Sequence, residues 1–315
     1  MHKKIEALKK ELSKAVIGQE QMIDGLLIGL LSDGHILVEG VPGLAKTTTI
    51  NALSKALGLE SKRIQFTPDL LPSDIIGAQI YNPQTNDFGI KKGPLFTNLL
   101  LADEINRAPS KVQSALLEVM QERQVTIGDE TFRIEPPFMV MATQNPIEQE
   151  GVYALPEAQL DRFMMKLVVT HNSEEDELTI MRKAATKSFE TVETVLNKEA
   201  LQALRDEVST LHVDEEVERY IVQLITATRE PERFGLESIQ NDLMYGASPR
   251  ASIDLYKAAK AKAFLRGNDH VTPADIGFVL HDVLRHRLVL NYEARAKGIN
   301  PDEIISKIVK EVPVP

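Results

Sequence analysis

A loop of eight residues near the N-terminus constrains the fold of this chain more than any other feature. It runs Gly40-Val41-Pro42-Gly43-Leu44-Ala45-Lys46-Thr47. Apart from Ala45, which stands at the second glycine position, it matches the phosphate-binding pattern Gly-x4-Gly-Lys-[Ser/Thr]. The apolar run Ile36–Glu39 before it predicts a buried strand, and the apolar spacing over residues 50–57 after it predicts a helix. A strand, a loop of this kind and a helix together indicate an α/β fold.

The residue types in this loop suit the binding of a nucleoside triphosphate. Its backbone N–H groups would surround the phosphates, and the following helix would direct the positive end of its dipole at them. Lys46 would reach the terminal phosphates, and the hydroxyl of Thr47 would ligate Mg²⁺. We therefore expect nucleotide contacts from Gly40, Val41, Pro42, Gly43, Leu44, Ala45, Lys46, Thr47 and Thr48. On this motif alone an ordinary glycine-rich β–α turn remains an alternative, because Ala45 departs from the pattern.

Short apolar runs alternate with helical patterns over the first 170 residues, which is typical of a largely parallel sheet covered by helices on both faces. We predict five strands, Ile36–Glu39, Lys62–Phe66, Asn98–Ala102, Phe138–Thr143 and Phe163–Val168. From Ser173 to the end of the chain only helical patterns occur. The sequence thus predicts an α/β core over residues 1–170 and a helical domain over residues 171–315.

Two polar segments follow predicted strands downstream of the loop. Asp103 and Glu104 end the run that begins at Leu99, in the Walker B arrangement. Asp103 would hold the Mg²⁺ shell, and Glu104 would orient and polarise the attacking water. Asn145 follows the fourth strand, where it would lie beside the terminal phosphate and hold the same water. A solvated acidic turn and a plain turn asparagine are the alternatives, and the order and spacing of the segments argue against them.

Composition narrows the class of protein further. The 315-residue chain has 43% hydrophobic and 26% charged residues, which is usual for a globular protein, and it has no cysteine. Thiol catalysis, thiolate metal sites and disulfides are therefore excluded. The formal net charge of −10 disfavours DNA as the main partner, because general nucleic-acid binders are usually basic. No apolar stretch suits a signal peptide or a membrane span, so we expect a cytoplasmic protein.

Several longer segments resemble the MoxR family of AAA+ ATPases. They are residues 100–109 (LLADEINRAP), 142–151 (ATQNPIEQEG) and 155–163 (LPEAQLDRF), and the similarity continues through 246–250 (GASPR) to 290–295 (LNYEAR). The resemblance extends over nearly the whole chain. The phosphate-binding loop with an alanine in place of its second glycine is itself the form of this family.

The resemblance implies an AAA+ core whose five-stranded parallel sheet has the order 5-1-4-3-2, followed by a small helical lid. It implies that residues from about 70 to 95 are the helix-2 insert of this clade, and that Ile17 and Gly18 lie against the adenine of ATP. The residues themselves predict a hairpin within the insert and a second hairpin over about 125–134. In related rings such hairpins face the central pore.

The resemblance also assigns two arginines to the terminal phosphate. Arg250, after Pro249 at the start of a predicted lid helix, is similar to the sensor 2 arginine and would contact the phosphate of its own subunit. Arg162 is similar to the arginine finger and would reach the nucleotide of the neighbouring subunit. With Glu104 and Asn145 they make up the expected catalytic set. A surface ion pair is the alternative for each arginine.

The resulting hypothesis is a Mg²⁺-dependent ATPase that forms a homo-oligomeric ring, expected to be a hexamer. The resemblance implies chaperone-like remodelling or maturation of a protein client, alongside a von Willebrand A-domain protein. Two other classes stay open, a nucleotide-gated switch or scaffold with little turnover and a DNA-remodelling motor. Turnover measured across protein concentration would distinguish a switch or scaffold from the ATPase. A salt-dependent DNA-binding assay would test the DNA-remodelling motor. GTP is disfavoured because no Asn-Lys-x-Asp motif occurs.

Overall fold

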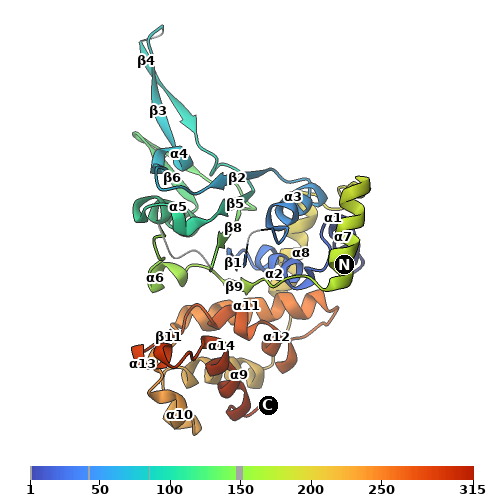
Figure 1. Ribbon diagram of the computed structural model, residues 1–315, viewed down its shortest axis with the longest axis vertical. Coiled ribbons are helices and arrows are strands. Elements are labelled where there is room, and N and C mark those ends of the chain that lie inside the picture. Colours follow the sequence, from blue (N-terminus) through green and yellow to red (C-terminus); the bar gives the residue numbers. More distant parts are fainter. Residues whose placement is uncertain (1, 42, 85, 147–151) are drawn as a thin grey trace.

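A parallel five-stranded sheet lies at the centre of the computed structural model, which describes residues 2–41, 43–84, 86–146 and 152–315 (Figure 1). The strands are β1 Ile36–Glu39, β2 Ser61–Gln65, β5 Leu99–Asp103, β8 Met139–Gln144 and β9 Met165–Val168. Their order across the sheet is β2-β5-β8-β1-β9. Counted along the chain, this is the predicted order 5-1-4-3-2, which is therefore confirmed. The predicted bounds of β1 agree with the observed ones, and those of the other strands differ by at most two residues.

Alternate residues of the central strands enter two different apolar cores, as the period of a strand requires. Ile36 and Val38 lie in a core with the N-terminal helices and the C-terminal helices, whereas Leu37 lies in a second core with the helix α5 Ser110–Glu122. The helices that cover the sheet are α1 His2–Ala15, α2 Glu20–Leu31, α3 Lys46–Ala56 and α5 Ser110–Glu122. Both faces of the sheet are therefore covered, which explains why its strands read as continuous apolar runs.

Two antiparallel hairpins leave the core, as predicted. The first joins β3 Gly77–Asn82 to β4 Asp87–Lys92, follows the short helix α4 Pro72–Ile76 and projects well beyond the rest of the molecule (Figure 1). The second joins β6 Gln124–Ile127 to β7 Glu130–Arg133. Glycine is needed at the base of the first hairpin. A Cβ on Gly77 would lie 2.3 Å from the backbone oxygen of Lys91, and its φ of 110° is outside the range of other residues.

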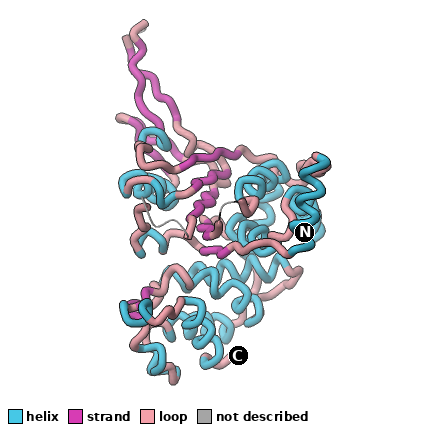
Figure 2. Tube along the Cα trace, in the orientation of Figure 1, coloured by secondary structure: helices cyan, strands magenta, loops and turns pink. Residues whose placement is uncertain are grey.

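The C-terminal part is helical, apart from one short pair of strands. Its α-helices are α7 Glu174–Thr186, α8 Lys198–Thr210, α9 Glu215–Ala227, α10 Glu237–Gln240, α11 Pro249–Leu265, α12 Pro273–Leu284, α13 Tyr292–Ala296 and α14 Pro301–Glu311. The strands β10 Leu243–Tyr245 and β11 Val289–Leu290 pair antiparallel within it (Figure 2). The prediction of helices alone was wrong here, because strands of two or three residues are too short to show a period of two.

The C-terminal helices occupy two places. Helices α9 to α14 form a layer beneath the sheet, whereas α7 lies beside α1 (Figure 1) and α8 packs against α2 and α11. Three further short helices connect the core elements and the lid, η1 Ile105–Arg107, α6 Glu157–Leu160 and η2 Pro231–Phe234. A domain boundary near residue 170 stays a prediction. Within the described ranges, none of the helices combines the length and the apolarity that crossing a bilayer requires.

Candidate active site

The carboxyl ends of β1, β5 and β8 enclose a cavity of about 410 Å³ together with the loop before α3. These strands are parallel and adjacent, so the residues that follow them meet at one edge of the sheet. The lining includes Gly40 of the loop, Lys46 and Thr47 at the start of α3, and polar residues at the ends of β5 and β8. Thr48 and Leu44 also line it. The side chain of Val41 packs against the apolar core, and Pro42 lies outside the described residues. The expected nucleotide contacts of these two residues stay predictions.

The loop has a conformation that suits a phosphate cradle. A Cβ on Gly40 would lie 2.8 Å from the backbone oxygen of Val169, so only glycine fits there. Gly43 has a φ of 90°, and nothing lies within 4 Å of its Cβ position, so its backbone faces open space. Ala45 also has a positive φ, 54°, which costs an L-residue about 1–2 kcal/mol. Hydrogen bonds from the loop to an anion would offset this local strain.

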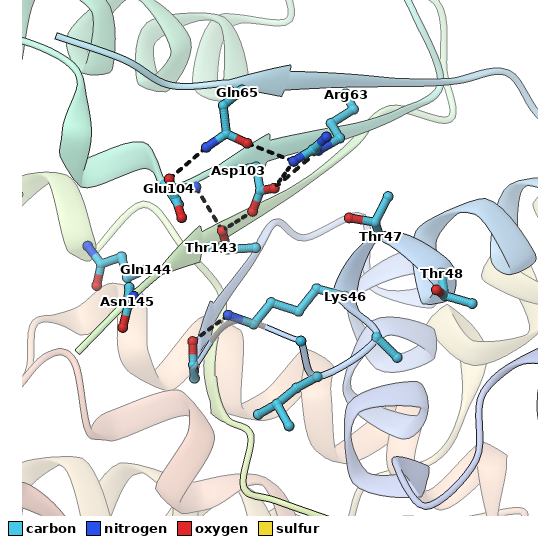
Figure 3. A pocket seen from close by; sticks show the side chains of 14 residues that line it. Lys46, Thr47, Thr48, Arg63, Gln65, Asp103, Glu104, Thr143, Gln144 and Asn145 are labelled. Atoms are coloured by element: carbon cyan, nitrogen blue, oxygen red, sulfur yellow. Dashed lines mark hydrogen bonds and ion pairs between the residues drawn. The ribbon is translucent and has the colours of Figure 1, made fainter. Parts of the chain in front are cut away.

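The ammonium group of Lys46 lies against the backbone of the phosphate-binding loop. Lys46 is the first residue of α3, and its Nζ donates a hydrogen bond to the backbone oxygen of Gly40 at 2.5 Å (Figure 3). Burial lowers the pKa of Lys46, and the carboxylates of Asp103, Glu104 and Glu39 oppose that shift. The ammonium group is therefore poorly hydrated, and phosphate oxygens would stabilise its charged form.

The two acids at the end of β5, Asp103 and Glu104, are held by a hydroxyl of β8. Thr143 Oγ1 donates to Asp103 Oδ1 at 2.7 Å and accepts from the backbone N–H of Glu104 at 2.8 Å. Glu104 has a φ of 56°, a strained conformation for a non-glycine residue. That conformation turns the chain at the end of β5, so both carboxylates line the same cavity (Figure 3).

Two residues of β2, Arg63 and Gln65, also line the cavity, and sequence reasoning missed both. Arg63 donates to Asp103 Oδ2, and Gln65 Nε2 donates to Glu104 Oε2 at 2.7 Å (Figure 3). In the register of the sheet, Gln65 lies directly opposite Asp103. The signal that could have found them is the polar alternation on a strand that pairs with the strand ending in Asp103.

Asn145 follows the fourth strand of the sheet, and its place beside a terminal phosphate stays a prediction. It lines the cavity from the residue after β8 and is only 8% exposed. The structure thus brings Asn145 into one cavity with Lys46, Thr47, Asp103 and Glu104.

The donor set of this cavity fits Mg²⁺. The hydroxyl of Thr47 and the carboxylate of Asp103 are hard oxygen donors, which Mg²⁺ prefers. Over the part of the chain that the structure describes, no group of three or more His, Cys, Asp or Glu side chains could hold a metal ion. Mg²⁺ sites in proteins commonly use one or two carboxylates and complete the shell with phosphate and water.

Arg162 and Arg250 lie together in a second cavity, of about 460 Å³, and neither lines the first. The second cavity is lined by the residues before β1 and before β9, and so lies at the amino-terminal edge of the sheet. Arg250 Nη1 is 3.4 Å from Asp161 Oδ2, and Asp161 Oδ1 accepts from Arg287 Nε at 2.8 Å. Arg250 therefore lies apart from the cavity that Lys46 and Asp103 line, and its contact with a phosphate stays a prediction.

Ile17 and Gly18 do not line the first cavity either. The backbone oxygen of Ile17 accepts from Asn172 Nδ2 at 3.3 Å, and Gly18, with a φ of 71°, lies against the side chain of Asp176. Their contact with adenine stays a prediction.

Comparisons with known proteins agree with this geometry. Residues 35–165 match the ATPase family associated with various cellular activities (AAA), and residues 237–308 match the AAA lid domain. The chain is 47% identical over 305 residues to Chaperone MoxR1 of Mycobacterium tuberculosis, covering 97% of this chain and 81% of that protein. It is 32% identical over 335 residues to Protein MoxR of Paracoccus denitrificans, and this match covers 100% of this chain and 97% of that protein.

A crystal structure of a protein from Cytophaga hutchinsonii has the same fold. Its TM-score with this chain is 0.94 at 51% sequence identity, and the match covers 100% of this chain and 96% of that one. The family model covers the core, the lid model covers the C-terminal helices, and the named relatives match over nearly the whole chain. The chain belongs to the MoxR family of AAA+ ATPases.

Proposed function

We propose that this ATPase hydrolyses ATP at Mg²⁺ sites that neighbouring subunits share in a homo-oligomeric ring, expected to be a hexamer. The observation that carries the proposal is the separation of the two arginines from the phosphate-binding loop. Lys46 and Glu104 lie at the carboxyl edge of the sheet, and Arg162 and Arg250 lie at the amino edge. In a head-to-tail ring the amino edge of one subunit can face the carboxyl edge of the next.

Each residue of the first cavity has a distinct role in this proposal. The loop backbone and Lys46 bind and orient the phosphates of ATP, and Thr47 and Asp103 hold Mg²⁺. The ion, when bound, would neutralise charge on the phosphates. Glu104 orients the attacking water and takes its proton, and Asn145 donates a hydrogen bond that fixes the same water.

Both arginines are assigned to the nucleotide of the neighbouring subunit. Arg162 would stabilise the charge that develops on the transferred phosphoryl group. Arg250 lies in the same cavity and is anchored through Asp161 to the buried Arg287. This assignment replaces the expected contact of Arg250 within its own subunit.

We expect Glu104→Gln to bind ATP normally and to hydrolyse it about 10²–10⁴-fold more slowly, because an amide cannot take the proton of the water. The bound fraction of a fluorescent ATP analogue and the steady-state release of phosphate are the two measurements. Glu118→Gln is the matched control, an exposed acid on α5 that the cavity does not include. Wild-type turnover in Glu104→Gln would show that Glu104 is only a surface acid.

We further propose that hydrolysis remodels a protein client. The projecting β3–β4 hairpin exposes apolar side chains, with Ile80 50%, Tyr81 48% and Phe88 62% exposed. Apolar side chains on a projecting element suit contact with another protein. The relative named Chaperone MoxR1 supports a chaperone-like role, and the resemblance supports a von Willebrand A-domain protein as a partner. Capture of a client by a Glu104→Gln ring held in the ATP-bound state would test this part.

A further inference from the structure

Arg63 contacts the carboxylate that the proposed function assigns to Mg²⁺. Its Nη2 lies 2.6 Å and its Nε 3.1 Å from the same oxygen, Asp103 Oδ2 (Figure 3). Nη2 also donates to Gln65 Oε1 at 2.7 Å. The other oxygen, Asp103 Oδ1, accepts from Thr143. Both oxygens of Asp103 therefore have donors within the protein.

A guanidinium in this position competes with a metal ion. Mg²⁺ requires short contacts to oxygen in a near-octahedral arrangement, whether it binds the carboxylate directly or through a water. The oxygen that already accepts two hydrogen bonds from Arg63 cannot offer its lone pairs to both cations. Thr143 takes one of the lone-pair sites of Oδ1. A Mg²⁺ ion that binds Oδ2, directly or through a water, therefore displaces Arg63.

The position of Arg63 allows this movement. Its strand, β2, is at the edge of the sheet, and its side chain is 50% exposed. An exposed ion pair of this kind is weak enough to be exchanged. Asp103 is only 17% exposed, so water screens its negative charge poorly and a cation beside it stabilises that charge.

We propose that Arg63 is the resident counter-ion of the metal site, which holds Asp103 in the nucleotide-free protein and gives way to Mg²⁺. The proposal rests on the proposed function, because it takes Asp103 as a metal-binding residue. Arg63 is thus a positioning residue that sets how strongly nucleotide binding depends on the metal. Without Mg²⁺, the charge of Arg63 reduces the repulsion between Asp103 and the phosphates. With Mg²⁺, the ion reduces this repulsion, and Arg63 competes with it for Asp103.

This gives opposite expectations for Arg63→Gln with and without metal. In excess EDTA the variant should bind ATP more weakly, on the order of tenfold, the size of one charge interaction in such a cavity. In saturating Mg²⁺ it should bind ATP as tightly as the wild type or more tightly. The ratio of the Kd in EDTA to the Kd in Mg²⁺ should therefore rise by about tenfold or more, whereas a merely structural defect would weaken binding in both conditions.

The experiment is a titration of a fluorescent ATP analogue into the nucleotide-free protein, once in EDTA and once in Mg²⁺. Lys62→Gln is the matched control, because it removes the same charge from the preceding position of β2. There Lys62 contacts Glu60 and the backbone of Phe96. Arg63→Lys keeps the charge, and its ratio should lie nearer the wild-type value. Thermal unfolding in EDTA checks that each variant is folded.

A ratio in Arg63→Gln equal to that of the wild type, or a ratio that Lys62→Gln raises equally, would overturn the proposal. Failure of the wild type to bind the analogue in either condition would instead overturn the proposed function. The two failures are therefore distinguishable.

Discussion

Lys46→Ala should leave the protein folded and abolish its binding of ATP. Lys46 contributes an ammonium group beside the loop, and removal of a charge-assisted contact with phosphate costs roughly 10²-fold or more in affinity. The side chain belongs to neither apolar core, so the fold should not depend on it. Burial lowers the pKa of Lys46, which indicates that its charge is poorly hydrated and available to an anion.

Titration with a fluorescent ATP analogue in Mg²⁺ measures this loss. Lys55→Ala is the control, because Lys55 is an exposed lysine in the last turn of the same helix. Both variants should unfold at temperatures close to that of the wild type. If Lys46→Ala bound the analogue as tightly as Lys55→Ala, the phosphate-binding loop would be wrongly assigned.

Arg162→Ala should retain ATP binding and lose hydrolysis by roughly 10³-fold or more, the scale of other arginine fingers. Arg162 lies at the amino edge of the sheet, so its own phosphate-binding loop keeps all of its contacts in the variant. The lost interaction is with the nucleotide of the neighbouring subunit, and it is made mainly in the transition state.

Phosphate release at saturating ATP and analogue binding separate these two effects. Arg182→Ala, at an exposed position of α7, is the matched control and should hydrolyse ATP like the wild type. A rate in Arg162→Ala within a few-fold of the control would mean that Arg162 is an ordinary surface arginine.

Much of the core was predictable because its signals are local. A buried parallel strand reads as a continuous apolar run, which is why the strands ending in Asp103 and Gln144 were found within one residue. The phosphate-binding loop follows β1, and the polar residues follow β5 and β8. Since parallel strands present their carboxyl ends at one edge, Lys46, Asp103 and Asn145 could be placed in one site. The order of the strands came from the resemblance and not from periodicity.

What could not be predicted depends on neighbours that are distant in sequence. Arg63 becomes part of the site only because β2 pairs with β5 in a register that places Gln65 opposite Asp103. Arg250 lies in the first turn of a helix in both the prediction and the structure. The packing of α11 decides which edge of the sheet Arg250 reaches. The β10–β11 pair joins segments that are more than 40 residues apart, and neither segment is long enough to show a pattern.

The most direct test of shared sites is to mix Arg162→Ala subunits with Lys46→Ala subunits, neither of which should be active alone. In a random equimolar ring, about a quarter of the interfaces would pair an intact loop with an intact arginine from the next subunit. ATP hydrolysis should therefore reappear on mixing, and the wild-type rate per subunit should rise with protein concentration as the ring assembles. No recovery on mixing, with a wild-type rate per subunit that stays constant on dilution to monomers, would contradict a site shared between subunits.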